Sequence, residues 1–563
     1  MIDNQLDRRK FFGIATMGVV FSGALQARPQ SVDGGRVQRN ALSTLENYMR
    51  THCRDWGLPG MTACLVDESG FTGFVHTGLA DLDKSIPMGP QHLFQIGSLT
   101  KSITSLTVWS LIDEGKLAPD LRLAEIMPEI AVRGGEEITL QQLMNHNSGL
   151  PGSAPIFVDG GLWVGSKPGS YWSYSNLGYE ILGKVVERVD ERSFSDSLKA
   201  RIFDPLGMSE TVAPIRKVDQ ARYAQGYEPA LFDRPHLRAG PMYQAPWVDY
   251  DLGSGCVAAT AGDMAIFLRY LIALSGGRGE PVFSDETARR FMSATADAAG
   301  WAAGARYGNG LACVTVKGRD YRHHTGGMLS FSSSLHVDLE AGVACFASTN
   351  VNGDHNYRPR DVTHYGCELL RSLKEGVAFP EATPSKPVIK CPPTYVGVFS
   401  AQNGDHFEVV EHNDGLAAVR DGYRFKITPV GDHNFACSHS MFELAGIDFD
   451  VADGAAIRAW VGGIEFLANP SLGFKKASTQ RRLFEGFYAN DDVWDLPSRV
   501  FMRGEKMCMK SGNNIFYLKQ SKNGDWRSDQ DQYSAERVRF DHPIDGRYQR
   551  LNISGRILMR RFA

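Results

Sequence analysis

The chain has 563 residues, of which 43% are hydrophobic and 22% charged, and its formal net charge is −4. A chain of this length exceeds a single hydrophobic core and predicts about two to four domains. The charge balance leaves no large basic field, so the composition gives no indication of nucleic-acid binding.

The first residues have the pattern of an export signal. Residues 7–13 read Asp-Arg-Arg-Lys-Phe-Phe-Gly, which resembles a twin-arginine motif, and an apolar run follows over residues 11–23. The run ends near Ala-Leu-Gln-Ala at residues 24–27, a plausible cleavage site. It is shorter than the roughly 20 residues that span a bilayer. We therefore expect a signal peptide over residues 1–27 and a bacterial protein that is periplasmic or secreted, with a membrane anchor as the alternative.

A serine and a lysine stand three residues apart, at Ser98 and Lys101, ahead of an apolar helical pattern over residues 103–112. Residues with this spacing share one face of a helix. A serine hydroxyl needs a neighbouring base to act as a nucleophile. A lysine serves as that base where burial or neighbouring charge lowers its pKa. The Ser-x-x-Lys spacing also arises by chance, so an exposed lysine beside an N-cap serine remains the alternative at this point.

Two further motifs follow along the chain. Tyr174 and Asn176 belong to a Tyr-Ser-Asn triplet that precedes an apolar helical pattern over residues 177–189. Residues 324–327 read His-Thr-Gly-Gly and lie between two apparent strands. An aromatic residue just before a helix is often a core residue, which is the alternative for Tyr174.

Together and in this order, the three motifs resemble the signature of the serine β-lactamase and penicillin-binding-protein superfamily. The Tyr-Ser-Asn form is similar to its class C, D-aminopeptidase and esterase-like branch, since class A enzymes carry Ser-Asp-Asn there. Residues 94–102, 146–151 and 204–208 resemble further landmarks of these proteins, and the resemblance covers about residues 40–375.

The resemblance implies acyl transfer through a covalent acyl-enzyme. Ser98 is then the nucleophile, and Lys101, desolvated beneath it, accepts or relays its proton. Tyr174 exchanges a proton with the leaving group, which a phenol does near neutrality if adjacent cations lower its pKa. Asn176 is expected to orient Lys101 and to bind the amide carbonyl of the substrate.

The His-Thr-Gly-Gly motif is expected to bind the substrate. His324 stands where many relatives have lysine, so a fractional charge predicts weaker and pH-dependent recognition of carboxylates; a packed strand histidine is the alternative. The backbone N–H groups of Ser98 and Gly327 are expected to form the oxyanion hole. Thr325 and Gly326 belong to the same strand, whose glycines permit a close approach of the substrate.

Residues 38–377 are predicted to form an α/β (α+β) catalytic domain of the β-lactamase/transpeptidase type. A helical half would carry the serine, the lysine and the tyrosine loop. Residues 215–255 lack periodicity, and either overhang the cleft or form a surface insertion. The antiparallel sheet would take its first strands from residues 60–66 and 73–78, and its last from residues 312–317, 332–338 and 342–348.

A proline-rich linker is predicted over residues 378–392. Beyond it, short alternating runs are separated by Asn-Gly and Asp-Gly pairs, and an aromatic-x-Gly-x-aromatic pattern occurs at residues 395–399 and 484–488. These signals predict antiparallel barrels or sandwiches. The order resembles that of D-aminopeptidases, which implies two small lipocalin-like β-barrels at residues 393–475 and 480–563. In those proteins a loop of one barrel reaches the active site, but the sequence identifies no such loop. A role in stability or dimerisation is the alternative.

No cofactor and no metal site are predicted. The nine cysteines are scattered and contain no Cys-x-x-Cys pair, and the fifteen histidines form no metal-binding motif. The chain also lacks a phosphate-binding glycine loop and the Gly-x-Ser-x-Gly elbow of α/β-hydrolases.

The leading functional hypothesis is a serine peptidase for short peptides that contain a D-residue, cut after D-Ala. The length and the export signal are also compatible with exported peptidases of this superfamily that cut linearised microcystin, although no residue singles them out. An esterase or amidase of the same scaffold is the first alternative. A β-lactamase and a non-catalytic peptide-binding protein are the further alternatives. The expected partner is a small peptide, without nucleic acid or a stable membrane anchor, and a homodimer stays open.

Overall fold

The computed structural model describes residues 36–229, 233–235, 240–293, 295–352, 357–382, 389, 391–413, 415–476, 478–529, 531 and 533–562. The predicted signal peptide, residues 1–27, lies outside the described residues. Within them, no helix combines the length and the apolar character needed to cross a bilayer.

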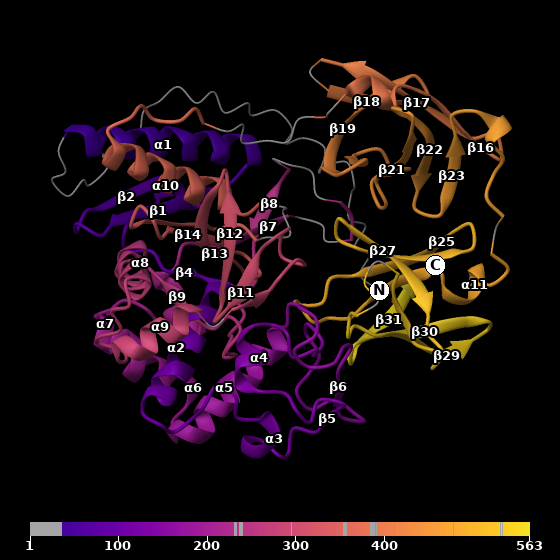
Figure 1. Cartoon of the computed structure of the whole chain (residues 1–563). Helices are drawn as coiled ribbons and strands as arrows, with labels where there is room; N and C mark the ends of the chain where they lie inside the picture. The colour runs from indigo at the N-terminus through magenta and orange to yellow at the C-terminus, as the bar shows by residue number, and fades with distance from the viewer. Residues whose placement is uncertain are drawn as a thin grey trace, which may run out of the picture.

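A nine-stranded antiparallel sheet forms the centre of the catalytic unit (Figure 1). Its spatial order is β10-β11-β12-β13-β14-β15-β1-β2-β3, so the first and last strands of the unit pair in the middle, with Cys64 opposite Phe346. This arrangement confirms the predicted fold class. The strands are β1 (Gly60–Asp67), β2 (Thr72–Asp81), β3 (Ile86–Pro87), β10 (Ala296–Asp297), β11 (Arg306–Gly308), β12 (Leu311–Val316), β13 (Arg319–Gly327), β14 (Ser332–Asp338) and β15 (Val343–Thr349).

Helices cover both faces of this sheet. Helices α1 (Arg36–Trp56) and α10 (Arg360–Glu375) pack on one face, and α8 (Ala261–Ser275) packs on the other (Figure 1). Successive side chains of a strand point to opposite faces, and β1 follows this rule: Leu65 joins the core under α1, whereas Cys64 joins the core under α8.

The helical half of the unit lies next to the face covered by α8. It carries two of the three motifs, the one with Ser98 and Lys101 and the one with Tyr174 and Asn176. Ser175 caps the helix that follows Tyr174, because its hydroxyl accepts a hydrogen bond of 3.1 Å from Gly178 N. The cap makes Asn176 the first residue of that helix. The helices are α2 (Thr100–Asp113), α3 (Leu123–Ile126), α4 (Leu140–Met144), α5 (Asn176–Asp190), α6 (Phe194–Leu198), α7 (Asp204–Leu206) and α9 (Asp285–Ser293).

Two closed barrels follow, each of eight antiparallel strands, as predicted. Three Asp-Gly pairs have positive φ at both residues and form the tight hairpins that their sequence indicates, at 421–422, 453–454 and 545–546. The first barrel comprises β16 (Gly397–Ala401), β17 (His406–His412), β18 (Gly415–Arg420), β19 (Tyr423–Gly431), β20 (Asn434–Cys437), β21 (Ile447–Ala452), β22 (Ala455–Val461) and β23 (Ile464–Leu467). The second comprises β24 (Gly486–Ala489), β25 (Ser498–Arg503), β26 (Lys506–Ser511), β27 (Asn514–Gln520), β28 (Trp526–Ser528), β29 (Val538–Ile544), β30 (Arg547–Ile553) and β31 (Arg556–Phe562).

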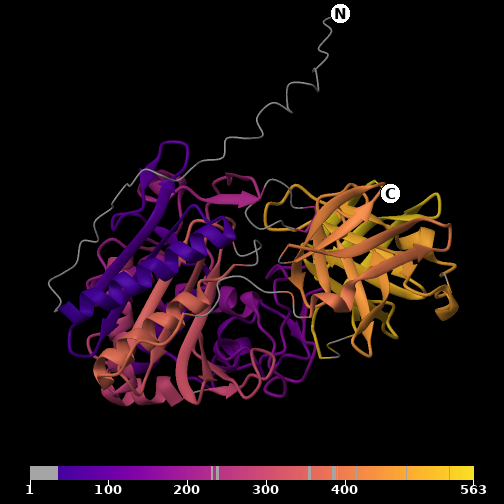
Figure 2. The same cartoon turned by 90° about the horizontal axis from the view of Figure 1, so that it is seen from above.

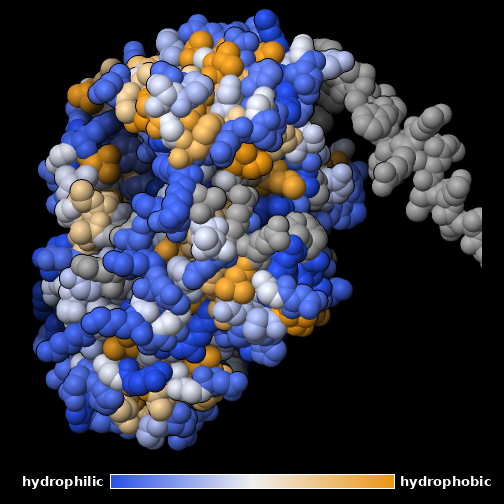
Figure 3. All heavy atoms as spheres, turned by 90° about the vertical axis from the view of Figure 1, so that its right-hand side faces the viewer, coloured by the Kyte–Doolittle hydropathy of each residue, from blue (hydrophilic) through white to orange (hydrophobic). Residues whose placement is uncertain are grey.

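The barrels form one lobe beside the catalytic unit (Figure 2). On the side that carries them the surface is mostly hydrophilic, with apolar residues in small separate groups (Figure 3). The apolar residues of each barrel gather instead in its own buried cluster.

Residues 533–537, which we call the barrel segment, dock the second barrel onto the catalytic unit. Trp163 Nε1 donates a hydrogen bond of 2.7 Å to Ala535 O. The Arg537 guanidinium lies 4.3 Å from the centroid of the same indole. Gly165 lies so close that a Cβ atom there would be 2.6 Å from Ala535 Cα. The docking therefore depends on the absence of a side chain at this glycine.

We expect Gly165→Ala to loosen the barrel segment, because the new methyl group meets backbone that cannot rotate away. Hydrogen–deuterium exchange of the peptide covering residues 533–537 should become about tenfold faster. Gly262→Ala is the matched control, since a Cβ atom there makes only an ordinary contact of 3.5 Å. Unchanged exchange in Gly165→Ala would show that this contact does not hold the segment.

Candidate active site

The structure brings the serine and the lysine of the first motif into direct contact. Ser98 lies in a 3-10 turn (η2, Gly97–Leu99) that leads into α2, and Lys101 lies in the first turn of α2. Lys101 Nζ is 2.9 Å from Ser98 Oγ. Lys101 is 0% exposed, so its amine meets protein groups rather than water.

Two more oxygen atoms surround the Lys101 amine. Asn176 Oδ1 lies 2.8 Å from Nζ, and the carbonyl oxygen of Ser254 lies 2.9 Å away. These two oxygens only accept hydrogen bonds, whereas the Ser98 hydroxyl also donates. A neutral amine therefore donates to both acceptors and keeps its lone pair for the proton of Ser98.

Burial favours that neutral amine. It lowers the pKa of Lys101 to about 7, and the Glu180 carboxylate opposes this effect in part. Glu180 is itself largely buried, which raises the pKa of its carboxyl, and Ser254 Oγ lies 3.4 Å from Glu180 Oε1. The lysine thus has a substantial fraction of free base at neutral pH.

Tyr174 lies beside the same amine, with Lys101 Nζ 5.0 Å from its ring centroid. Burial of the phenol raises the pKa of Tyr174 well above its usual value, while a hydrogen bond with Ser98 and the charge of Arg358 act in the opposite direction. The condition stated for proton exchange near neutrality, a phenol pKa lowered by adjacent cations, is not met, because desolvation outweighs the charge of Arg358. The phenol is protonated at neutral pH.

His324 is fully enclosed by aromatic rings, among them Trp301 at a centroid distance of 5.0 Å. Burial lowers the pKa of His324 well below its usual value, with the charge of Lys101 acting in the same direction. The expected fractional charge is therefore wrong. His324 Nδ1 donates to Thr325 O at 2.6 Å, and Nε2 has no hydrogen-bond partner among the described residues. The imidazole offers an acceptor, not a cation, so it is unsuited to hold a carboxylate.

The glycines of β13 lie against the turn that carries Ser98. A Cβ atom on Gly97 would be 2.6 Å from Gly327 N, and one on Gly326 would be 2.9 Å from the carbonyl carbon of Ile96. Only glycine allows this approach. The backbones of Ser98 and Gly327 are thus neighbours, as an oxyanion hole requires.

Sequence reasoning missed three groups. Glu180 lies four residues after Asn176 on α5, a spacing that puts both on one helix face and could have revealed it. Ser254 contributes a backbone carbonyl, for which no local pattern exists. Arg358 lies beside Gly327, where a Cβ atom would be 2.6 Å from its Nη1. Arg358 lies just before α10, far from the glycine motif in sequence, so no local pattern indicates its contact with Gly327.

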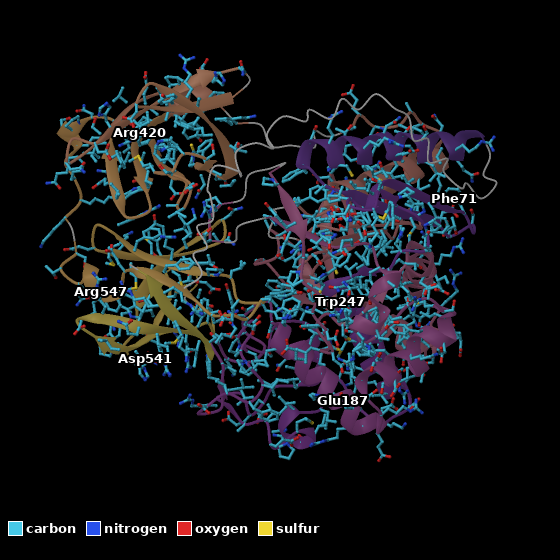
Figure 4. All side chains as sticks on the ribbon, turned by 180° about the vertical axis from the view of Figure 1, so that it is seen from behind. Phe71, Glu187, Trp247, Arg420, Asp541 and Arg547 are labelled. Carbon is cyan, nitrogen blue, oxygen red and sulfur yellow. The ribbon has the colours of Figure 1, made fainter. Side chains whose placement is uncertain are left out.

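Within the segment at residues 215–255, for which two interpretations were open, residues 217–226 and 245–248 contribute to the lining of a cavity of about 540 Å³ next to the end of β13. Tyr223 and Trp247 come from this segment, and Phe331 follows β13. Trp247 lies nearer to the barrels than Phe71 does (Figure 4). A substrate bound along β13 has this cavity beside it.

The second barrel supports the helix start that bears Asn176. Glu536 of the barrel segment accepts a hydrogen bond of 2.6 Å from Gly152 N, and Gly152 O accepts one of 2.7 Å from Asn176 N. The sequence identified no barrel loop near the site. In the structure, the barrel segment contacts Gly152, whose carbonyl oxygen accepts the hydrogen bond from Asn176 N.

Comparisons with known proteins show similarity to β-lactamases and penicillin-binding proteins. The family model described as Beta-lactamase matches residues 44–366. Penicillin-binding protein 4 of Amycolatopsis lactamdurans is 28% identical over 352 residues, which cover 56% of this chain and 85% of that protein. Penicillin-binding protein 4* of Bacillus subtilis (strain 168) is 24% identical over 434 residues, with coverages of 70% and 90%. The octameric penicillin-binding protein homologue from Pyrococcus abyssi has a similar fold, with a TM-score of 0.55, 19% identity and coverages of 84% and 99%.

We expect Glu180→Gln to lower the pKa of Lys101 further, because the carboxylate that favours the ammonium is removed. Ser98 reacts when Lys101 is neutral, so its rate of modification by a fluorophosphonate should rise with pH through about 7 in the unaltered protein. In Glu180→Gln this rise should move about one unit to lower pH. Glu187→Gln, on the exposed side of the same helix, is the control. A rise at the same pH in all three proteins would contradict the role of Glu180.

Proposed function

Since the chain belongs to the beta-lactamase family and is a serine hydrolase, we propose that it cleaves short peptides that contain a D-residue, with Ser98 as its nucleophile. The observation that carries this proposal is the buried Lys101 amine in contact with Ser98 Oγ. A lysine whose pKa is about 7 is matched to proton transfer near neutral pH.

Acylation begins when Ser98 Oγ attacks the carbonyl carbon of the scissile amide. Neutral Lys101 takes the hydroxyl proton, and negative charge moves to the carbonyl oxygen. The N–H groups of Ser98 and Gly327 stabilise that oxyanion; each such donor contributes roughly 3 kcal/mol. Asn176 and the Ser254 carbonyl then hold the new ammonium in place.

The leaving amine needs a proton before the C–N bond breaks. Tyr174 supplies it as a neutral phenol, and Lys101 returns the proton taken from Ser98 to the phenolate. In deacylation a water molecule loses a proton to the same groups, attacks the acyl carbon and releases Ser98 as the hydroxyl. The protons balance over the cycle, and the site returns to its starting state.

The preference for peptides over esters rests on this protonated phenol, because an amide nitrogen leaves only when protonated whereas an alkoxide leaves more readily. The preference for a D-residue, D-Ala on the acyl side, rests on the similarity of the three motifs to D-aminopeptidases. Linearised microcystin is one peptide that we include among the substrates to be tested.

The barrel segment supports a preference for short substrates. It docks at Trp163 and at Gly152, which is bonded to Asn176, and so places protein next to the catalytic helix start. A carboxylate on the substrate would find its positive partner in Arg358 rather than in His324.

The proposal extends to location and partners. The twin-arginine-like segment at residues 7–13 supports export to the periplasm or the medium. The proposed partner is then a small peptide. We expect neither a nucleic-acid partner nor a stable membrane anchor.

Paired peptides that differ only in D-Ala or L-Ala at one position test the proposed substrate class. We expect mass spectrometry to show cleavage after D-Ala only, falling more than about 10³-fold in Ser98→Ala. Linearised microcystin, a penicillin and a p-nitrophenyl ester complete the set. Ester turnover without peptide cleavage would overturn the peptidase in favour of an esterase, and penicillin turnover alone would indicate a β-lactamase.

Tyr174→Phe tests the proton donor. Peptide turnover should fall by about 10² to 10⁴, whereas turnover of the p-nitrophenyl ester should fall less than about tenfold, because its leaving group needs no proton. Tyr171→Phe changes a tyrosine of the same loop that faces Tyr533 and is the matched control. Equal losses for peptide and ester in Tyr174→Phe would contradict the assignment.

A further inference from the structure

The second barrel encloses a cavity of about 530 Å³ that the proposed reaction does not use. Its floor is apolar and includes Met509, Phe516, Leu518 and Leu558. This volume is in the range of small-molecule binding sites.

Phenylalanine rings occupy much of the described interior of the first barrel. The ring of Phe407 lies 5.5 Å from Phe399, 5.0 Å from Phe442 and 5.1 Å from Phe466, measured between centroids. In the second barrel the aromatic rings gather around Phe484 at the end closed by helix α11 (Arg481–Phe484). Phe484 does not line the cavity, which opens at the opposite end.

A buried polar group points to a ligand in this cavity. Ser498 lines it and is 1% exposed, yet its hydroxyl has no hydrogen-bond partner among the described residues. An unsatisfied buried hydroxyl is unfavourable. A ligand that reaches Ser498 with a polar group would remove this cost.

The mouth of the cavity is acidic. Asp495, Asp531 and Glu536 line it together with a single arginine, Arg556, which is paired with Asp495. A negatively charged ligand would meet these carboxylates on entry, whereas a neutral or cationic ligand would not be repelled. The charges therefore exclude anions such as fatty-acid carboxylates from the preferred ligands.

The mouth faces the catalytic unit. Glu536 bonds to Gly152, and the ring of Trp494 lies 5.1 Å from that of Tyr250, whose hydroxyl is 2.9 Å from Ser254 Oγ. Trp494 lines both this cavity and the one beside β13. The two cavities thus share a wall next to the catalytic residues.

We propose that the interior of the second barrel binds the apolar part of a neutral or cationic amphipathic ligand, with one polar group of the ligand at Ser498 and its polar end at the acidic mouth. The ligand is either a free small molecule or the distal end of the substrate held at Ser98. The binding site does not depend on the proposed peptidase activity; only the second source of the ligand does.

The first experiment measures binding directly, with the neutral fluorophore N-phenyl-1-naphthylamine and the full chain. We expect saturable enhancement of its fluorescence, unchanged in Ser98→Ala. Ser498→Leu and Ser511→Phe fill the cavity from two strands and should each weaken binding about tenfold. Lys519→Trp, on the exposed outer face of β27, should not. Circular dichroism identifies any variant that fails to fold. No enhancement, or equal enhancement in folded, filled variants, would overturn the proposal.

The second experiment tests the charge of the ligand. Decylamine should displace the fluorophore, whereas decanoate, with the same chain length and the opposite charge, should do so at least about tenfold less effectively. Equal displacement by both would overturn the role given to the carboxylates at the mouth.

The third experiment identifies the source of the ligand. A D-Ala peptide with a decylamide end is compared with the same peptide carrying a methylamide. If the substrate reaches the barrel, the longer peptide has the lower KM, and Ser498→Leu removes the difference. Equal KM values alongside fluorophore binding would assign the cavity to a free small molecule. Failure of the peptidase itself would leave the fluorophore result intact.

Discussion

The amine of Lys101 has three oxygen neighbours, and they come from three segments far apart in sequence: the turn before α2, the start of α5 and the loop at residue 254. Lys101 is 0% exposed, so its amine is shielded from bulk solvent by the described residues. An ammonium in such a place loses its hydration, so the neutral form gains. The nucleophilicity of Ser98 therefore depends on the burial of the Lys101 side chain, which lowers the pKa of its amine.

The same constraint governs the other titratable groups of the site. Burial keeps the phenol of Tyr174 protonated and the imidazole of His324 uncharged. A permanently charged guanidinium, that of Arg358, lies beside these groups. Preorganised N–H groups then act in a medium where their dipoles are effective.

Local patterns in the sequence were enough to predict the motif residues, the strands at the middle of the sheet and the Asp-Gly hairpins. They could not predict the protonation states, because the rings that bury His324 belong to other segments, such as Trp301. They also could not predict that the barrel segment would contact Gly152, since that contact joins residues 384 positions apart. The turns predicted short antiparallel strands, and the resemblance to D-aminopeptidases predicted barrels. The space inside a barrel depends on side-chain volumes summed around it, which neither signal gives.

The fold makes Lys101 a base at neutral pH, and titration of its amine tests this directly. The protein labelled with ¹³C at lysine Cε would be titrated by NMR, with the Lys101 resonance assigned by its absence from Lys101→Met. We expect a midpoint near pH 7. A midpoint near the usual lysine value of about 10.4 would contradict it.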